Sequence, residues 1–255
     1  MGNTYAIINQ KGGVGKTTTV ANLGAALANK GKKVLLVDLD AQSNLSTHYN
    51  IMADDSQDML SMYDVLCKQA PLTAIIVEIN DNLHLAPSSL LLSAADFELN
   101  AVLGREFMLK NAIQTVVDKY DLILIDCPPS LGVLSINGLV ASTKAIIPVQ
   151  SEFLALIGVR QLLDTIEKVR SIYNPSLAVG GAFVSMFDSR KRLDKSVAET
   201  VKQYFGEVLF DTMIRKNVAL AEAPAKGSSI YSYDANSSGA QDYNSLAEEI
   251  IKRDS

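Results

Sequence analysis

The chain has 255 residues, of which 48% are hydrophobic and 20% charged, with a formal net charge of −5 at pH 7. These values exclude a disordered chain and are typical of an α/β protein with a substantial core, so we expect a single domain over residues 1–255. The acidic balance argues against a uniformly basic nucleic-acid binder, although a local basic patch remains compatible with it. No apolar run approaches the roughly 20 residues that span a bilayer, and no signal sequence opens the chain, so we expect a cytoplasmic protein.

A glycine-rich stretch at residues 9–18 joins a short apolar run to a segment with helical periodicity. Its three glycines let consecutive backbone N–H groups converge on one anion, and the following helix adds its positive N-terminal end. Lys16 would then reach the β- and γ-phosphates, and the Thr17 hydroxyl would bind Mg²⁺. The stretch predicts a site for a Mg²⁺–nucleoside triphosphate made by Gly12, Gly13, Val14, Gly15, Lys16, Thr17 and Thr18.

Apolar segments without alternation predict the strands of a parallel sheet that helices cover on both faces. The expected strands cover residues 6–8, 34–37, 83–86, 122–125, 145–147 and 178–184. The expected helices cover residues 16–31, 58–68, 90–99, 105–119, 154–173 and 193–204, and a last helix ends at 253. Because helices separate most of the strands, the sequence predicts one doubly wound, mostly parallel α/β sheet with right-handed connections.

Carboxylates follow two of the predicted strands, at the edge where open α/β sheets bind ligands. Asp38 and Asp40 end the second strand, and Asp126 ends the buried strand 122–125. Asp126 is therefore placed to orient Mg²⁺ or its bound water, and the loop 130–132 to sense a γ-phosphate. For Asp40, the alternative is that its side chain only caps the next helix.

The glycine-rich stretch departs from the standard phosphate-loop pattern, because Gln10 replaces the first glycine and a second lysine, Lys11, follows it. This combination resembles the deviant Walker A box of the ParA/MinD ATPases. The resemblance implies a P-loop fold of that type, with ATP and Mg²⁺ as cofactors. It also implies a homodimer in the ATP-bound state, in which Lys11 crosses to the nucleotide of the other subunit. Asp40 would position or activate the attacking water, so that Lys11, Lys16 and Asp40 are catalytic and Thr17, Asp40 and Asp126 surround the metal.

Two later segments, 185–190 and 213–224, resemble further ParA signatures, so that the resemblance covers nearly the whole chain. In the family, contacts to the nucleotide base come partly from the segment that matches residues 214–217. The implied nucleotide-binding residues are Met186, Arg215, Lys216 and Asn217. Arg215 stands where proline is usual and Lys216 where arginine is usual, so we expect base recognition to differ in detail.

Residues 190–226 hold eight basic and five acidic side chains, which makes this region positive within an acidic chain. If residues 193–204 are helical, Leu193, Val197 and Val201 face the core while basic side chains share another face. We expect a DNA-binding surface made by Arg190, Arg192, Lys195, Lys202, Arg215 and Lys216. The alternative is an ordinary solvated helix face, and the arginine that the family often uses for DNA is Ala219 here.

The leading functional prediction is a ParA/Soj-type partition ATPase. As an ATP-bound dimer it would bind non-specific DNA and associate with the nucleoid. A ParB-like partner would stimulate its slow hydrolysis and so segregate plasmid, chromosome or other cargo. The alternatives are a MinD-like membrane-cycling ATPase and a metabolic P-loop ligase or reductase.

Features of the sequence weigh against these alternatives. We expect the last helix to be an ordinary helix of the fold without a basic amphipathic membrane anchor, and we expect no helix-turn-helix extension before the first strand. Cys67 and Cys127 lack cluster spacing, so we expect two reduced thiols rather than a disulfide, zinc or iron–sulfur site. His48 and His84 are isolated and predict ordinary surface or capped side chains.

Overall fold

The computed structural model describes residues 2–51, 59–151 and 155–254. Its seven-stranded sheet has the order β3-β4-β2-β5-β1-β6-β7, and only the β3–β4 pair is antiparallel. The strands are β1 (Asn3–Ile7), β2 (Val34–Asp38), β3 (Val77–Asn80), β4 (Leu83–Ala86), β5 (Leu122–Asp126), β6 (Lys144–Gln150) and β7 (Ala178–Ser185). The predicted fold class, a doubly wound and mostly parallel sheet, is confirmed. The sequence prediction missed β3, an edge strand whose side chains alternate between half-buried and exposed.

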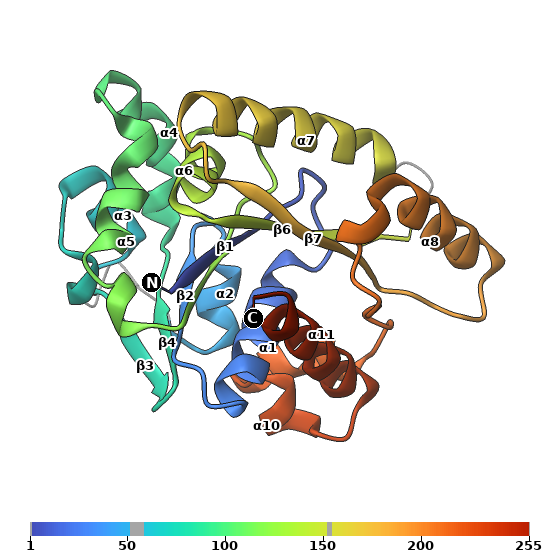
Figure 1. Cartoon of the computed structure of the whole chain (residues 1–255). Helices are drawn as coiled ribbons and strands as arrows, with labels where there is room; N and C mark the ends of the chain where they lie inside the picture. The colour runs from blue at the N-terminus through green and yellow to red at the C-terminus, as the bar shows by residue number, and fades with distance from the viewer. Residues whose placement is uncertain (1, 52–58, 152–154, 255) are drawn as a thin grey trace.

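Helices cover both faces of the sheet (Figure 1). They are α1 (Lys16–Asn29), α2 (Asn44–His48), α3 (Met62–Lys68), α4 (Ala95–Glu98), α5 (Met108–Gln114), α6 (Val133–Ala141), α7 (Ala155–Ile172), α8 (Arg192–Phe205), α9 (Ala219–Glu222), α10 (Ile230–Asp234) and α11 (Ser238–Asp254). Among the described residues, no helix is both long enough and apolar enough to cross a bilayer.

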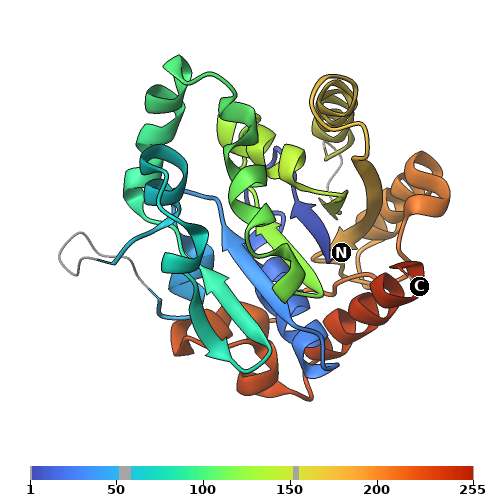
Figure 2. The same cartoon turned by 60° about the vertical axis from the view of Figure 1, so that its left-hand side comes forward.

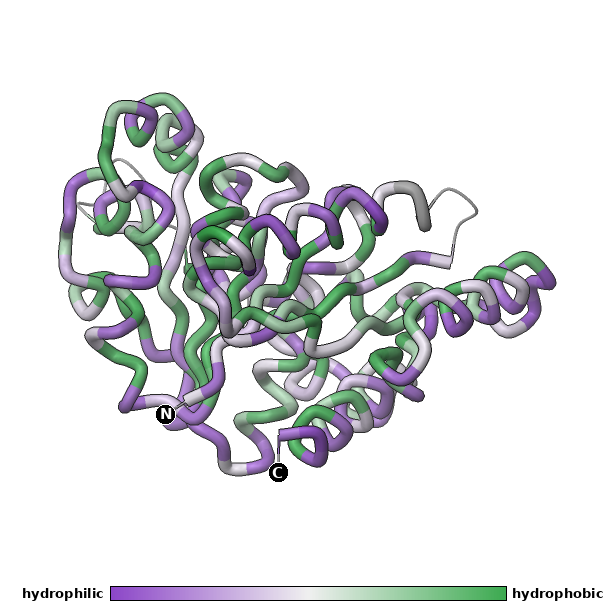
Figure 3. The backbone as a smooth tube through the Cα atoms, turned by 45° about the horizontal axis from the view of Figure 1, so that its top comes forward, coloured by the Kyte–Doolittle hydropathy of each residue, from purple (hydrophilic) through white to green (hydrophobic). Residues whose placement is uncertain are grey.

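The central strands are buried on both faces, which explains their continuous apolar sequence. Successive side chains of β5 point to opposite faces, so Ile123 and Ile125 join one apolar cluster while Leu122 and Leu124 join the other. Helices α3, α5, α6, α7 and α8 contribute to the first cluster, and α1, α2, α10 and α11 to the second. Figure 2 shows the sheet between the two layers of helices. In Figure 3, which colours the chain by residue hydropathy, hydrophobic stretches run through the interior of the molecule.

Two predicted helices are shorter than expected. The segment 105–119 forms α5 only at Met108–Gln114, with 3₁₀ turns at Arg105–Phe107 and Val117–Lys119. The helix ends where Thr115 Oγ1 donates to the Ala112 carbonyl, because this local bond competes with the helical ladder. The segment 90–99 is likewise 3₁₀ at Leu90–Ala94 before the short helix α4 begins.

Two predicted helix starts, at residues 58 and 154, lie outside the described residues. Within the described part of the first segment, α3 begins after Ser61. Ser61 and Asp64 form a capping box. The Asp64 side chain accepts a hydrogen bond from the Ser61 backbone N–H, and the Ser61 side chain accepts one from the backbone of the first helical turn. This capping box explains why the regular helix starts at Met62 rather than nearer to residue 58.

The predicted inward face of α8 is wrong at one position. Val197 and Val201 are buried, but Leu193 is 55% exposed, and Asp194 takes the inward position instead. The Asp194 carboxylate accepts hydrogen bonds from Ser151 Oγ and from the Asp188 backbone N–H, both at 2.9 Å. A buried carboxylate with two donors ties the start of α8 to the ends of β6 and β7, so the apolar stripe begins later than the sequence suggested.

Candidate nucleotide-binding site

The loop between β1 and α1 is held open by backbone conformation and by side chains beneath it. Gly13 and Gly15 have φ values of 76° and 90°, in the left-handed region that favours glycine. Asn9 Nδ2 donates to the Pro148 carbonyl at 2.8 Å, and Asn9 Oδ1 accepts from the Lys11 N–H at 3.0 Å. Ser185 Oγ, at the end of β7, donates to the Val14 carbonyl at 2.8 Å. The loop is therefore fixed to the carboxyl ends of β6 and β7.

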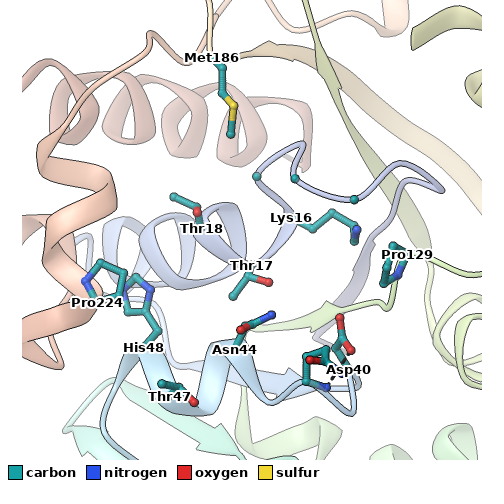
Figure 4. Close-up of a pocket in the computed structure, with 14 residues that line it drawn as sticks. Lys16, Thr17, Thr18, Asp40, Asn44, Thr47, His48, Pro129, Met186 and Pro224 are labelled. Carbon is teal, nitrogen blue, oxygen red and sulfur yellow. Dashed lines mark hydrogen bonds between the residues drawn. The ribbon is translucent and has the colours of Figure 1, made fainter. Parts of the chain in front are cut away.

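A cavity of about 520 Å³ lies against this loop, which is within the usual size of a nucleotide pocket (Figure 4). The predicted residues that line it are Gly12, Gly13, Gly15, Lys16, Thr17, Thr18, Asp40 and Met186. Six other lining residues were not predicted from the sequence: Gln42, Asn44, Thr47, His48, Pro129 and Pro224. These six come from the turn and helix after β2 and from two distant loops, so only the fold brings them to the phosphate loop.

Asp126 lies below the cavity with one carboxylate oxygen available. Thr17 Oγ1 donates to Asp126 Oδ2 at 2.6 Å, whereas the buried Oδ1 has no hydrogen-bond partner in the described structure. Burial, and next the charge of Asp38, raise the pKa of Asp126 well above its usual range. Burial also lowers the pKa of Lys16, which is only 7% exposed. A bound cation would relieve the orphaned oxygen, because a carboxylate and a hydroxyl are ligands that Mg²⁺ takes.

The described residues contain no group of three or more His, Cys, Asp or Glu side chains that could hold a metal by themselves. A Mg²⁺ ion at Thr17 and Asp126 would therefore need its other ligands from water and from nucleotide phosphates. This is the usual way in which proteins bind Mg²⁺ together with a nucleotide. The donor set fits a metal that arrives with its nucleotide.

Asp38 and Asp40, at the end of β2, differ in their hydrogen-bond partners and in their position relative to the cavity. The fully buried Asp38 accepts from Ser46 N–H at 2.8 Å and Ser46 Oγ at 2.7 Å through Oδ2, and from Asp40 N–H at 3.2 Å through Oδ1. Burial raises the pKa of Asp38 to about 6. Asp40 Oδ1 accepts from the Gln42 N–H at 3.0 Å, and its side chain borders the cavity. Asp38, rather than Asp40, satisfies an N–H in the first turn of α2, a role that the sequence analysis missed.

A second, smaller cavity of about 200 Å³ adjoins the first at Gly15, Thr18 and Met186. Met186 has a φ of 55°, unusual for a residue with a side chain, and it borders both cavities. The segment 214–217 that the sequence analysis assigned to base contacts lines this second cavity. Residues that it missed complete the wall: Ser185, Leu220, Ala221 and Tyr243. Mostly apolar walls beside a phosphate site suit a planar base.

Lys11 lies beside the loop rather than in its cavity. Its Nζ donates to Gln150 Oε1 at 3.1 Å, at the end of β6, and Lys11 is absent from the described residues that line the cavity. Lys16 Nζ, by contrast, lies in the cavity wall and 3.5 Å from the Lys11 carbonyl oxygen. The two lysines of the loop are thus directed to different places.

His48 is buried instead of lying at the surface. Its Nε2 donates to the Ser228 carbonyl at 3.1 Å, and burial lowers the pKa of the imidazole to about 4. The ring is therefore neutral at pH 7, and it lies beside Pro224 in Figure 4. His84 is half-buried, with Nδ1 2.8 Å from the Tyr120 hydroxyl.

The structure divides the six residues of the expected DNA surface. Arg192, Lys195 and Lys202 are exposed on α8, and Lys216 is exposed in the loop before α9. The guanidinium of Arg190 instead forms a paired contact with Asp188, at 2.8 and 2.9 Å. Arg215 forms a similar contact with a carboxylate of α11. Two of the six cations are thus already bound to acidic side chains.

The comparisons with known proteins agree with this geometry. A family model described as an AAA domain matches residues 2–179. The chromosome-partitioning ATPase Soj of Treponema pallidum is 46% identical over 255 residues, which cover 100% of this chain and 99% of that protein. The sporulation initiation inhibitor protein Soj of Bacillus subtilis is 45% identical over 251 residues, 98% of each chain.

Among solved structures, cobyrinic acid a,c-diamide synthase from Mycobacterium smegmatis with bound ADP and magnesium superimposes with a TM-score of 0.85. It is 36% identical, and the match covers 99% of this chain and 95% of that one. The resemblance that the glycine-rich stretch and the later signatures indicated is confirmed, and the chain belongs to the ParA/Soj family of ATPases.

Proposed function

We propose that this protein is a partition ATPase that binds Mg²⁺–ATP at the 520 Å³ cavity, dimerises, binds DNA without sequence preference and hydrolyses ATP slowly. The observation that carries the proposal is the pair of Thr17 and Asp126. In the described part of the chain, Asp126 Oδ1 is buried without a hydrogen-bond partner, and Asp126 Oδ2 is bonded to the loop that presents Lys16. A site with this charge and donor pattern suits a metal-bound triphosphate better than any uncharged ligand.

The residues would divide the reaction as follows. Lys16 and the N-terminal end of α1 bind the phosphates, and Thr17 and Asp126 hold the Mg²⁺. When bound, the metal neutralises charge that develops on the phosphate oxygens. Asp40 orients the attacking water in line with the bond that breaks, which is most of what such a site contributes to phosphoryl transfer.

The nucleotide base would occupy the 200 Å³ cavity, since Gly15 and Thr18 border both cavities and connect them. Met186 would lie between the base and the phosphates. Its flexible thioether can follow the shape of the ligand at little cost. The mostly apolar walls of this cavity would bind the base by its shape.

Dimerisation is proposed from Lys11. This lysine is directed away from its own cavity, toward Gln150, and this orientation supports a role at the phosphates of a second copy. The names of the relatives support the rest of the proposal: Soj of Treponema pallidum is a chromosome-partitioning ATPase. DNA would then bind the exposed cations of α8, and a ParB-like protein would stimulate hydrolysis.

Light scattering and co-sedimentation test the proposal together. The purified chain is mixed with ATP or ADP and then with DNA fragments or anionic liposomes. We expect a dimer and DNA binding with ATP only. Lys11→Ala should bind ADP normally and fail to dimerise, whereas the control Lys119→Ala, which changes an exposed lysine, should behave as wild type.

The other outcomes would identify the competing functions. ATP-dependent binding to liposomes instead of DNA would indicate a membrane-cycling ATPase. ATP binding with neither dimer nor DNA complex would favour a metabolic enzyme, and the similar Mycobacterium smegmatis structure is named as a synthase.

A further inference from the structure

The loop before α9 is joined to the C-terminal helix by an ion pair with several hydrogen bonds. Arg215 Nε donates to both carboxylate oxygens of Asp242 at 3.0 Å, and its Nη2 donates to Oδ1 at 2.6 Å. The Arg215 backbone N–H also donates to Asp242 Oδ2, at 2.8 Å. The Asp242 carboxylate is 10% exposed, so these donors replace most of its contact with water.

One end of this ion pair lies in the wall of the 200 Å³ cavity, and the other end is adjacent in sequence to a residue of that wall. Arg215 lines the cavity directly, and Asp242 precedes Tyr243, which lines it from α11. The Tyr243 hydroxyl lies 3.1 Å from Thr19 Oγ1, which donates to the Gly15 carbonyl at 2.7 Å. The ion pair therefore connects the two walls of this cavity next to the phosphate loop.

Asn217 makes a second connection between the same loop and α11. Its Nδ2 donates to Ser238 Oγ at 2.6 Å, and its Oδ1 accepts from the Ala219 N–H at 2.7 Å. The nitrogen and the oxygen of the Asn217 amide are therefore both engaged in hydrogen bonds that hold the loop in place. The position of the loop thus depends on its contacts with α11.

We infer that Arg215 is a positioning residue for the nucleotide base: its ion pair with Asp242 fixes the spacing of the walls between which the base binds. The inference rests on the proposed function, because it names how the same nucleotide site is shaped. The Arg215 backbone N–H also donates to Asp242, so this contact needs a residue with a backbone N–H, which proline lacks.

The inference predicts a loss of affinity that depends on the base. Arg215→Ala leaves the Asp242 carboxylate buried with one donor, the backbone N–H of residue 215, so the loop is held to α11 less firmly. We expect the dissociation constant and KM for Mg²⁺–ATP to rise about 10-fold. The value of kcat should stay unchanged, because Lys16, Thr17 and Asp40 are untouched. Affinity for Mg²⁺–tripolyphosphate, which has the phosphates but no base, should also stay unchanged.

The matched control is Lys30→Ala. Lys30 Nζ pairs with Glu248 Oε1 at 2.8 Å, so this variant also removes an ion pair to α11, but away from both cavities. It should keep wild-type affinity for ATP. Asp242→Asn should weaken ATP binding like Arg215→Ala, and the double variant should lose little more than either single one. Arg215→Lys, which keeps the charge, should recover part of the affinity and covers the case in which Arg215→Ala folds poorly.

Calorimetric titration with ATP and with tripolyphosphate distinguishes the outcomes. Equal ATP affinity in wild type and Arg215→Ala, or equal losses for ATP and tripolyphosphate, would overturn the positioning role while leaving the proposed function intact. Failure of the wild type to bind either ligand would instead contradict the nucleotide site itself and remove the basis of the inference.

Discussion

Two regions of the molecule present lysine side chains in different surroundings. In the phosphate loop, Lys16 is 7% exposed and stands near the buried carboxylate of Asp126. On α8, Lys195 and Lys202 project into solvent. A buried charge acts through fixed geometry, whereas exposed charges act through their number and are screened by salt. Single substitutions should therefore be severe in the cavity and mild on the helix.

The largest expected effect is that of Lys16→Ala. This change removes the cation that offsets the phosphate charge in a desolvated site, and it leaves Asp126 without its nearest positive group. We expect ATP affinity to fall roughly 100-fold or more, with loss of dimerisation and DNA binding. Titration with a fluorescent ATP analogue measures this. Near-normal ATP affinity in Lys16→Ala would show that one buried lysine in the cavity matters no more than one exposed lysine on α8.

Asp40→Ala should affect hydrolysis alone. The carboxylate borders the cavity, and Asp38 would still hold the turn through Ser46. We expect normal ATP binding and a persistent dimer, with turnover reduced roughly 100-fold because the attacking water loses its orientation. Phosphate release under saturating ATP measures the rate. If Asp40→Ala keeps the wild-type turnover while Asp126→Ala is inactive, a group other than Asp40 orients the attacking water.

The cavity was largely predictable because its main residues are adjacent in sequence. The glycines, Lys16 and Thr17 lie within one short stretch of chain, and Asp126 is the last residue of an otherwise apolar strand. Their spacing in the sequence is therefore enough to predict that they share one site. The carboxyl ends of parallel strands then bring Asp40 to the same edge of the sheet.

Other site residues could not be found in this way, because only tertiary packing brings them together. His48 and Pro224 both line the cavity, although 176 positions separate them in the sequence. Tyr243 reaches the base cavity from the last helix. At Leu193, helical periodicity gave the wrong inward face because the hydrogen bonds of Asp194 outweighed the apolar stripe. The departure from proline at position 215 was a signal, but its partner Asp242 was not visible in the sequence.

The cavity side should also show a pH signature that the exposed cations lack. His48 has a pKa of about 4 in the folded protein, below the ordinary value of 6.5, because burial disfavours its charged form. The unfolded chain therefore binds a proton more readily as the pH falls through 6.5, and stability is lost from there down to pH 4. Between pH 8 and pH 5 the loss should be about 2 kcal/mol.

Urea unfolding of wild type and His48→Asn at both pH values isolates this contribution. Asp38 acts in the opposite direction, because its pKa is raised to about 6 and the folded protein takes up its proton first. That contribution is common to both proteins and cancels in their difference. We expect the stability advantage of wild type over His48→Asn to shrink by about 2 kcal/mol from pH 8 to pH 5. A constant difference would show that His48 is not held neutral.

The smallest effects should come from single changes on α8, and they sharpen the comparison most directly. Arg192→Ala, Lys195→Ala and Lys202→Ala should each weaken ATP-dependent DNA binding only a few-fold. The logarithm of the DNA-binding constant falls linearly with the logarithm of the salt concentration. Each variant should make this slope less steep by about 1, since each cation releases about one counterion from DNA. The triple variant should show the sum of the three changes, because exposed and separate charges add.

Arg190→Ala offers a contrast on the neighbouring loop. Arg190 already binds Asp188 through two guanidinium nitrogens, so DNA would have to compete with a carboxylate for it. We expect this variant to change the salt slope less than any of the three α8 variants, with Lys168→Ala on α7 as an exposed control. Fluorescence anisotropy of labelled DNA over a salt series gives the slopes. If Arg190→Ala lowers the slope as much as Lys195→Ala, the ion pair opens on DNA and the surface extends onto that loop. If all four variants keep the wild-type slope, DNA binds elsewhere, and the exposed lysines of α8 only solvate the helix.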